Sequence, residues 1–251
     1  MKLYADYAHA SISMSKDSMF KATLDWLFAE NDIDVVIECG TYLGIGSTAS
    51  MAQAIINSGK PHPLFYTIEA DEQIHKEAVE NLKRFPFVTP LWGLSVDCAA
   101  ARDFILNDDA IRNHEQYPDV FIDYIDNPID IYIEEIEGQL SKTLEKNEAL
   151  LLEVTSGSNG REFRDNILYS LADKLENATP LFLLDSAGGI GYFEFQSVQQ
   201  IMNGRPHFII LDDIHHLKHF RSYRDISDES NGYTIINESV ENGWAVAKFG
   251  E

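Results

Sequence analysis

The stretch from Val35 to Ser47, VVIECGTYLGIGS, constrains the fold of this chain more than any other. A β-branched apolar run ends in an acid, Glu38, and three glycines follow before a helical segment at residues 47–56. A buried parallel strand that leads through a glycine turn into a helix N-terminus is how an open α/β sheet makes room for a nucleotide-like ligand. The sequence therefore predicts an α/β sheet with a ligand crevice at this turn.

Two further strand-like runs follow the glycine turn. Residues 64–68 end in Glu69, about thirty residues after Glu38. A carboxylate at that point can accept hydrogen bonds from both ribose hydroxyls of an adenosine. The next run, Val88 to Trp92, is followed by Gly93-Leu94-Ser95 and a helical segment. The first half of the chain thus alternates strands and helices, as a parallel sheet requires.

The composition excludes several partners. The chain has 251 residues, enough for one α/β domain with an insertion or for two small domains. Its 41 Asp and Glu residues outnumber 19 Lys and Arg residues. Nucleic acid and anionic membranes are therefore not expected as partners, because both are bound mainly through basic side chains. Two cysteines, Cys39 and Cys98, make neither a disulfide framework nor a zinc site.

No targeting or membrane segment is evident in the sequence. The N-terminal stretch lacks an apolar signal core, and no apolar run approaches the roughly 18 residues that span a bilayer. We therefore expect a cytoplasmic protein.

The second half of the chain predicts two more buried strands and a terminal hairpin. Strands at 181–184 and 208–211 end in Asp185 and in Asp212-Asp213, and two β-rich runs at 233–236 and 244–249 form the hairpin on the sheet edge. Residues 111–179 exceed what a helix crossover needs. We interpret them as an insertion that covers the pocket, with helices at 129–145 and 161–176. The short runs 120–122 and 149–152 could instead be sheet strands, which would renumber the later ones.

These motifs resemble a known family. The pattern strand, Glu38-x-Gly40-x-x-x-Gly44, strand, Glu69, strand, Gly93-x-Ser95 is similar to the first three motifs of class I S-adenosylmethionine-dependent methyltransferases. The resemblance covers residues 34–97 and 181–251, and it implies a Rossmann-like, seven-stranded, mostly parallel sheet with a terminal antiparallel hairpin. We expect one domain spanning residues 1–251. The resemblance also implies that cofactor binding involves the residues of these motifs, namely Glu38, Gly40, Gly44, Glu69 and Ser95. We add Tyr42, which lies within the turn, as a further candidate cofactor-binding residue. Leu94 departs from the pattern, since an acid is common there.

The same glycines also fit the turn of short-chain dehydrogenases. That family requires a Tyr-x-x-x-Lys pair, and none of the eleven tyrosines has a lysine four residues on. The missing pair argues against this family, so we keep an NAD(P)-dependent oxidoreductase as the alternative enzyme, behind the methyltransferase. A non-catalytic protein that binds a cofactor and grips a partner through the insertion is a further alternative.

Three carboxylates are expected to converge at the ends of the late strands. Asp185, Asp212 and Asp213 each follow an apolar strand, and the carboxyl ends of parallel strands open onto the ligand crevice. Without a nearby cation they would repel one another, and a divalent metal such as Mg²⁺ would relieve that repulsion. The arrangement is similar to metal-dependent O-methyltransferases of the catechol and macrolide-sugar kinds, which implies that these three aspartates bind Mg²⁺. The alternative is that they cap the helices that follow.

A general base is expected close to these acids. The sequence Ile214-His215-His216-Leu217-Lys218 follows directly, and His216 and Lys218 are our candidate catalytic residues. They could instead belong to a solvated helix start, and His215 or His216 could be an extra metal ligand.

The sequence thus predicts an enzyme that transfers a methyl group from S-adenosylmethionine to an oxygen of a small hydroxylated acceptor, a sugar or polyol, assisted by Mg²⁺. The insertion or the N-terminal helix could serve as the surface of a homodimer.

Overall fold

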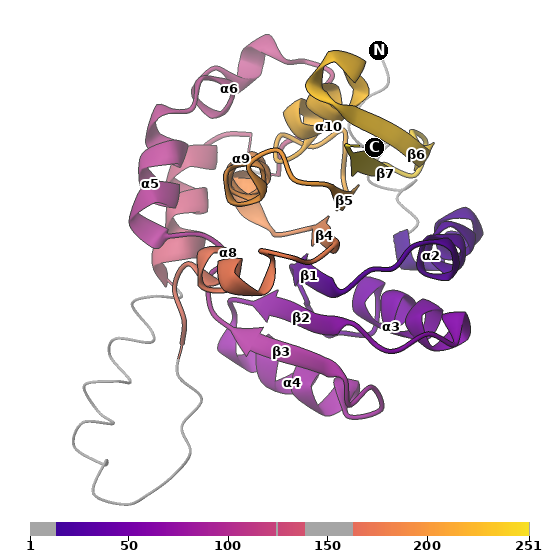
Figure 1. Ribbon diagram of the computed structural model, residues 1–251. Helices are drawn as coiled ribbons and strands as arrows, with labels where there is room; N and C mark the ends of the chain where they lie inside the picture. The colour runs from indigo at the N-terminus through magenta and orange to yellow at the C-terminus, as the bar shows by residue number, and fades with distance from the viewer. Residues whose placement is uncertain (1–13, 124, 139–162, 251) are drawn as a thin grey trace, which may run out of the picture.

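A seven-stranded sheet forms the centre of the molecule. The computed structural model describes residues 14–123, 125–138 and 163–250, and its strand order is β3-β2-β1-β4-β5-β7-β6 (Figure 1). The strands are β1 (Val35–Cys39), β2 (Leu64–Glu69), β3 (Val88–Trp92), β4 (Pro180–Leu184), β5 (His207–Leu211), β6 (Tyr233–Ser239) and β7 (Trp244–Phe249). All seven predicted strands are therefore confirmed, with the sheet order of the expected Rossmann-like fold.

The pairing of the strands brings their carboxyl ends to one edge. β1 to β5 are parallel, and β7 lies antiparallel between β5 and β6 as the predicted edge hairpin. In register, Cys39 is opposite both Ile68 and Leu184, and Leu184 is opposite Leu211. Glu69, the last residue of β2, and Asp185 and Asp212, which follow β4 and β5, therefore lie at the same end of the sheet.

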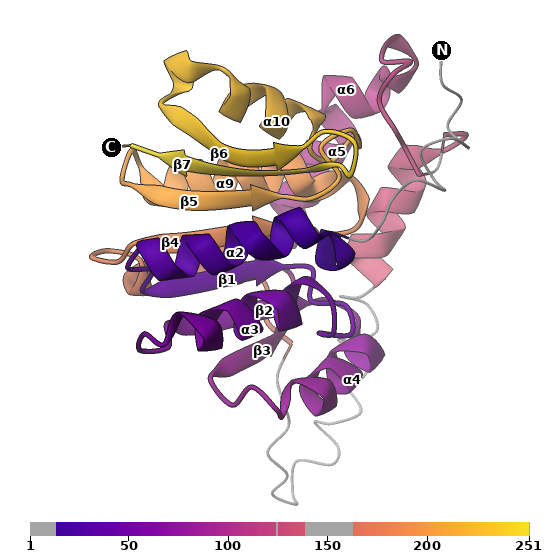
Figure 2. The ribbon, with the colours of Figure 1, turned by 90° about the vertical axis from the view of Figure 1, so that its right-hand side faces the viewer.

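Helices cover both faces of the sheet, because successive strand residues point to opposite sides. In β1, Val35 and Ile37 pack in one buried cluster and Val36 in the other. Figure 2 looks at the face that carries the helices at 18–30 and 47–58, while the helices at 98–107 and 191–202 lie behind the sheet and the helix at 220–227 lies beside the hairpin. The helices are α2 (Ser18–Glu30), α3 (Ser47–Ser58), α4 (Glu72–Leu82), α5 (Cys98–Asn107), α6 (Asp109–Arg112), α8 (Ile167–Ser170), α9 (Gly191–Met202) and α10 (Phe220–Ser227). Short 3₁₀ turns occur at Met14–Lys16 (η1), His114–Gln116 (η2), Ala172–Lys174 (η3), Gly188–Ile190 (η4) and Glu229–Asn231 (η5).

Part of the predicted insertion, residues 111–179, is described. Residues 128–138 are helical, in agreement with the predicted helix as far as the description extends, and Glu137 pairs with Arg102 of α5 at 2.6 Å. The run 120–122 adds no strand to the sheet: it makes only an isolated bridge between Phe121 and His216. The run 149–152 lies outside the described residues. The strands after the insertion thus keep the numbers β4 and β5.

The predicted continuous helix at 161–176 is wrong over its described part. Only the short α8 and η3 are helical there, and Arg164 forms a bridge with Gly93 after β3. The Arg164 N–H donates to the carbonyl of Trp92, and the Leu94 N–H donates to the carbonyl of Arg164. These bonds use backbone groups that a helix would pair internally, so tertiary contact overrides the helical pattern.

In the part of the chain that the structure describes, no helix is both long enough and apolar enough to span a membrane.

Candidate functional site

The glycine turn after β1 fits against the end of β4. Gly40 has φ +95°, a conformation that side chains disfavour, and a Cβ atom there would lie 2.2 Å from the carbonyl oxygen of Asp185. Gly44 also has a positive φ, and a Cβ there would meet the side chain of Leu82 in α4 at 2.9 Å. Glycine is therefore required at both positions so that the turn can pack between its neighbours.

Glu38 is a buried anchor of this turn. Its Oε1 accepts from the Ser47 hydroxyl, and its Oε2 accepts from the hydroxyls of Thr48 and Thr67, each at 2.6 Å. The Thr67 oxygen lies 2.5 Å from that of Thr41 in the turn. Burial raises the pKa of Glu38 from 4.5 to about 7, although the three hydroxyl donors lower it. Glu38 thus joins β1, β2, the turn and the start of α3.

Glu69 is held at the end of β2 by two backbone groups. Its Oε2 accepts from the Tyr42 N–H at 2.8 Å, and its Oε1 accepts from the Asp71 N–H at 2.9 Å. Burial raises the pKa of the Glu69 carboxyl, and these two bonds lower it. A carboxylate has about four acceptor positions, so both oxygens can accept further hydrogen bonds. Tyr42 itself has φ +48° and is 63% exposed.

Ser95 contacts a second buried acid, Glu194, which the sequence analysis missed. Its hydroxyl is hydrogen-bonded to Oε1 of Glu194 in α9, which also accepts from the Ser186 hydroxyl at 2.7 Å. Glu194 is fully buried, and burial raises its pKa from 4.5 to about 7. An acid within the apolar run Tyr192–Phe195 was the available signal for this residue.

One pocket joins the glycine turn to the end of β4 and to Lys218, while Asp212 and Asp213 after β5 are not among its lining residues. It has a volume of about 530 Å³. Among the residues that line it are Gly40, Tyr42, Glu69, Ser95, Asp185 and Lys218. The structure therefore brings the predicted cofactor and catalytic regions together. Glu38 and Gly44 support the turn from outside this lining through the contacts described for each.

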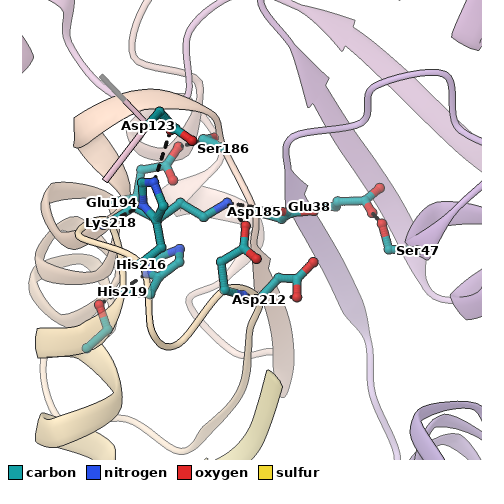
Figure 3. A network of polar contacts seen from close by, with 12 residues as sticks. Glu38, Ser47, Asp123, Asp185, Ser186, Glu194, Asp212, His216, Lys218 and His219 are labelled. Atoms are coloured by element: carbon teal, nitrogen blue, oxygen red, sulfur yellow. Dashed lines mark hydrogen bonds and ion pairs between the residues drawn. The ribbon is translucent and has the colours of Figure 1, made fainter. Parts of the chain in front are cut away.

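Lys218 lies between two of the aspartates, Asp185 and Asp213, at the β4 end of the pocket. Its Nζ is 2.9 Å from Oδ1 of Asp185 and 2.9 Å from Oδ2 of Asp213. Figure 3 shows this side chain reaching toward Asp185, with Asp212 beside it and Glu38 turned away toward Ser47. The aspartates converge as predicted, but the premise that no lysine lies nearby is wrong.

The charges of this cluster depend on one another. Burial raises the pKa of Asp212 well above its ordinary value, and the charges of Asp185 and Asp213 raise it further. Burial disfavours the Lys218 ammonium, yet the three aspartates more than offset this and raise the pKa of Lys218. Lys218 is only 5% exposed and stays protonated. The arrangement thus opposes its predicted role as a general base and makes it a fixed positive charge.

His216 is occupied by protein partners. Its Nδ1 accepts from the Lys218 backbone N–H at 3.0 Å, and its Nε2 lies 3.0 Å from Oδ2 of Asp123. The residue is 3% exposed and is not among those that line the pocket. These contacts give His216 a part in shaping the loop that presents Lys218, and they do not support its predicted role as a base.

The three predicted metal ligands lie close together, but the Lys218 ammonium lies between two of them. Among residues 14–123, 125–138 and 163–250, no group of three or more His, Cys, Asp or Glu side chains is arranged to hold a metal ion. The Lys218 ammonium already contacts two of the three carboxylates. As arranged, Asp185, Asp212 and Asp213 do not fit Mg²⁺, and their metal role stays a prediction.

The glycine loop after β4 accommodates the helix of residues 128–138. A Cβ at Gly188 would lie 2.4 Å from Oε2 of Glu135, and one at Gly189 would lie 2.6 Å from the Tyr132 ring. Glu135 and Ile136 also line the pocket. The described part of the predicted insertion therefore contributes to the wall of the pocket, and Glu135 is a lining residue that the sequence analysis did not single out.

Comparisons by sequence find no relatives. No protein-family model matches the chain, and no curated protein matches it.

Solved structures do resemble it. The O-methyltransferase TomG from Streptomyces achromogenes, in complex with SAM, is 11% identical, covering 100% of this chain and 92% of that one, with a TM-score of 0.46. A provisionally assigned O-methyltransferase from Klebsiella pneumoniae is 11% identical over the same shares, with a TM-score of 0.49. A provisionally assigned caffeoyl-CoA O-methyltransferase from Staphylococcus aureus is 14% identical, covering 93% of this chain and 84% of that one, with a TM-score of 0.46.

Proposed function

We propose that this protein transfers a methyl group from S-adenosylmethionine to a hydroxyl oxygen of a small acceptor, a sugar or another polyol. The observation that supports this most is the shared pocket. Its lining runs from Gly40 and Glu69, on the donor side, to Asp185 and Lys218, on the acceptor side. A methyl donor and an acceptor must meet in one enclosed space, because the reacting atoms have to be held close and in line.

The donor side suits an adenosine with a methionine tail. Glu69 keeps acceptor positions for the two ribose hydroxyls while its backbone partners fix its orientation. The Gly40 turn brings main chain rather than side chain to the pocket. Ser95 lines the same wall beside Leu94.

The charge of the lining favours a cationic donor over a dinucleotide. The described lining residues with carboxyl groups are Glu69, Asp71, Glu135 and Asp185, and Lys218 is the only Lys or Arg among the described lining residues. The diphosphate of NAD(P) would face this acidic surface with little compensation. In addition, the Glu38 carboxyl occupies the start of α3, where a dinucleotide diphosphate would bind. A sulfonium and an amino group are attracted by the same charges.

The acceptor side can bind and activate a hydroxyl group. When bound, S-adenosylmethionine supplies a methyl group on a positively charged sulfur, and the acceptor oxygen forms the new C–O bond as the C–S bond breaks. Asp185 takes the proton that the hydroxyl loses. The Lys218 ammonium stabilises the negative charge that develops on that oxygen. Carboxylate and ammonium groups side by side suit an acceptor with several hydroxyls, which supports the sugar or polyol class.

Radiolabelled S-adenosylmethionine with a panel of sugars, polyols and catechols tests this function. We expect methylated product from at least one polyol, and we expect Asp185→Asn to lower turnover by about 100-fold or more while S-adenosylhomocysteine still binds. Glu77→Gln, an exposed change on α4, is the matched control. Cofactor binding with no methyl transfer to any acceptor would favour the non-catalytic alternative.

A further inference from the structure

The position that a metal ion would take among the three aspartates is taken by an ammonium group of the chain itself. Lys218 Nζ contacts one oxygen of Asp185 and one of Asp213, both at 2.9 Å. Asp212 adds a third negative charge that acts on the lysine. A buried lysine with carboxylates on several sides is a cation held by its ligands, much as a bound metal would be.

This lysine is fixed by the loop that carries it. Its own backbone N–H donates to Nδ1 of His216, and the loop starts at Asp213, which has φ +53°. The side chain is 6% exposed, so it does not move freely in solvent. His216 is in turn held by Asp123 at 3.0 Å. The position of the ammonium is therefore set by the fold.

A divalent ion would compete directly with this ammonium. Mg²⁺ binds oxygen ligands at about 2.0–2.1 Å and demands near-octahedral geometry. An ion on the same oxygens of Asp185 and Asp213 would lie no more than about 5 Å from Nζ, given the 2.9 Å contacts. Two like charges at that separation in a buried site repel strongly. The site can therefore hold one cation or the other.

We propose that Lys218 is the resident cation of the acceptor site and that methyl transfer by this chain proceeds without a divalent metal. The proposal rests on the proposed function and specifies its chemistry. Lys218 holds Asp185 in place and faces the acceptor oxygen, so it supplies the charge that a metal ion would otherwise supply. Because an ammonium offers three donors and no open coordination positions, it selects an acceptor through hydrogen bonds rather than by chelation of two oxygens.

Titration with Mn²⁺ alone, followed by electron paramagnetic resonance of the free ion, tests this. We expect the wild-type protein to show no saturable site below about 1 mM. Lys218→Ala removes the ammonium and leaves the carboxylates unpaired, so we expect it to gain one Mn²⁺ per chain with affinity at least tenfold higher. The double variant Lys218→Ala with Asp185→Asn should lose that site again. Lys76→Ala, which removes an exposed lysine on α4, is the control and should gain none.

The outcomes separate clearly. A wild-type site for Mn²⁺ that Asp185→Asn abolishes would overturn the proposal, and so would a folded Lys218→Ala protein that binds no Mn²⁺. Folding is checked by circular dichroism, and if Lys218→Ala does not fold, the wild-type titration still decides. Binding of S-adenosylhomocysteine is measured on the same samples. If S-adenosylhomocysteine does not bind, the proposed function is refuted, whereas the Mn²⁺ result bears on Lys218 alone.

Discussion

The Oε2 atom of Glu69 accepts a 2.8 Å hydrogen bond from the backbone N–H of Tyr42. This bond joins the end of β2 to the glycine turn after β1, the two features that the sequence predicts as the donor site. Since the Asp71 N–H holds the other oxygen at 2.9 Å, the carboxylate is oriented before any ligand arrives. Such prior orientation lowers the entropy lost on binding.

Replacement of Glu69 by alanine should weaken the binding of S-adenosylhomocysteine. The variant loses hydrogen bonds between a charged carboxylate and the ribose hydroxyls, and each bond of this kind contributes about 1.5–3 kcal/mol. We expect the dissociation constant measured by calorimetry to rise by at least 10-fold. Glu77→Gln on α4 is the control and should leave the affinity unchanged. Equal affinity in Glu69→Ala and wild type would remove Glu69 from the ribose site.

Replacement of Gly40 by alanine should destabilise the protein through a collision as well as through backbone strain. The added Cβ would meet the carbonyl oxygen of Asp185 at 2.2 Å, and φ is +95°. We expect the free energy of unfolding in urea to fall by about 2–4 kcal/mol. Gly59→Ala is a matched control, because Gly59 also has a positive φ (+66°) but no atom within 4 Å of its added Cβ. The free energy of unfolding of Gly59→Ala should fall by about 1–2 kcal/mol. Equal losses would show that the close approach to Asp185 has no cost.

The buried acid Glu38 should make stability depend on pH. Its pKa is about 7 in the folded protein and 4.5 when unperturbed, so the folded state binds more protons between these values. Its contribution is therefore complete below pH 4.5 and is lost as the pH rises through 7, a change of about 3 kcal/mol.

Urea unfolding at pH 5 and pH 8.5 checks this for Glu38→Gln, in which the fall in stability with pH should be smaller. Part of the pH dependence of stability should remain in this variant, because the pKa of Glu194 is also raised to about 7. The exposed Glu30→Gln on α2 is the control and should retain the full wild-type fall. The expectation for Glu38 fails if both variants show the same pH dependence as wild type.

The sequence predicts the strand ends well because parallel strands place their carboxyl ends on one edge. Glu69 and Asp185 could be assigned to that edge from the apolar runs before them alone. The partners of these acids could not be predicted. Lys218 lies 33 positions after Asp185, and its contact depends on a left-handed residue, Asp213, that redirects the loop.

The sequence also failed to predict segments whose structure depends on tertiary contacts. The residues around Arg164 have a helical pattern, but they pair with the backbone at Gly93 instead. Glu194 contacts Ser95 across 99 positions of sequence, so only the folded chain reveals that pair. Local patterns carry no information about such long-range partners.

Calorimetric titration of the wild-type protein with S-adenosylhomocysteine and with NAD⁺ tests the central claim most directly. The acidic pocket with Glu69 on its wall predicts that S-adenosylhomocysteine binds at one per chain, at least tenfold more tightly than NAD⁺, a difference of about 1.4 kcal/mol or more. Tighter binding of NAD⁺, or no heat of binding with S-adenosylhomocysteine, would contradict it.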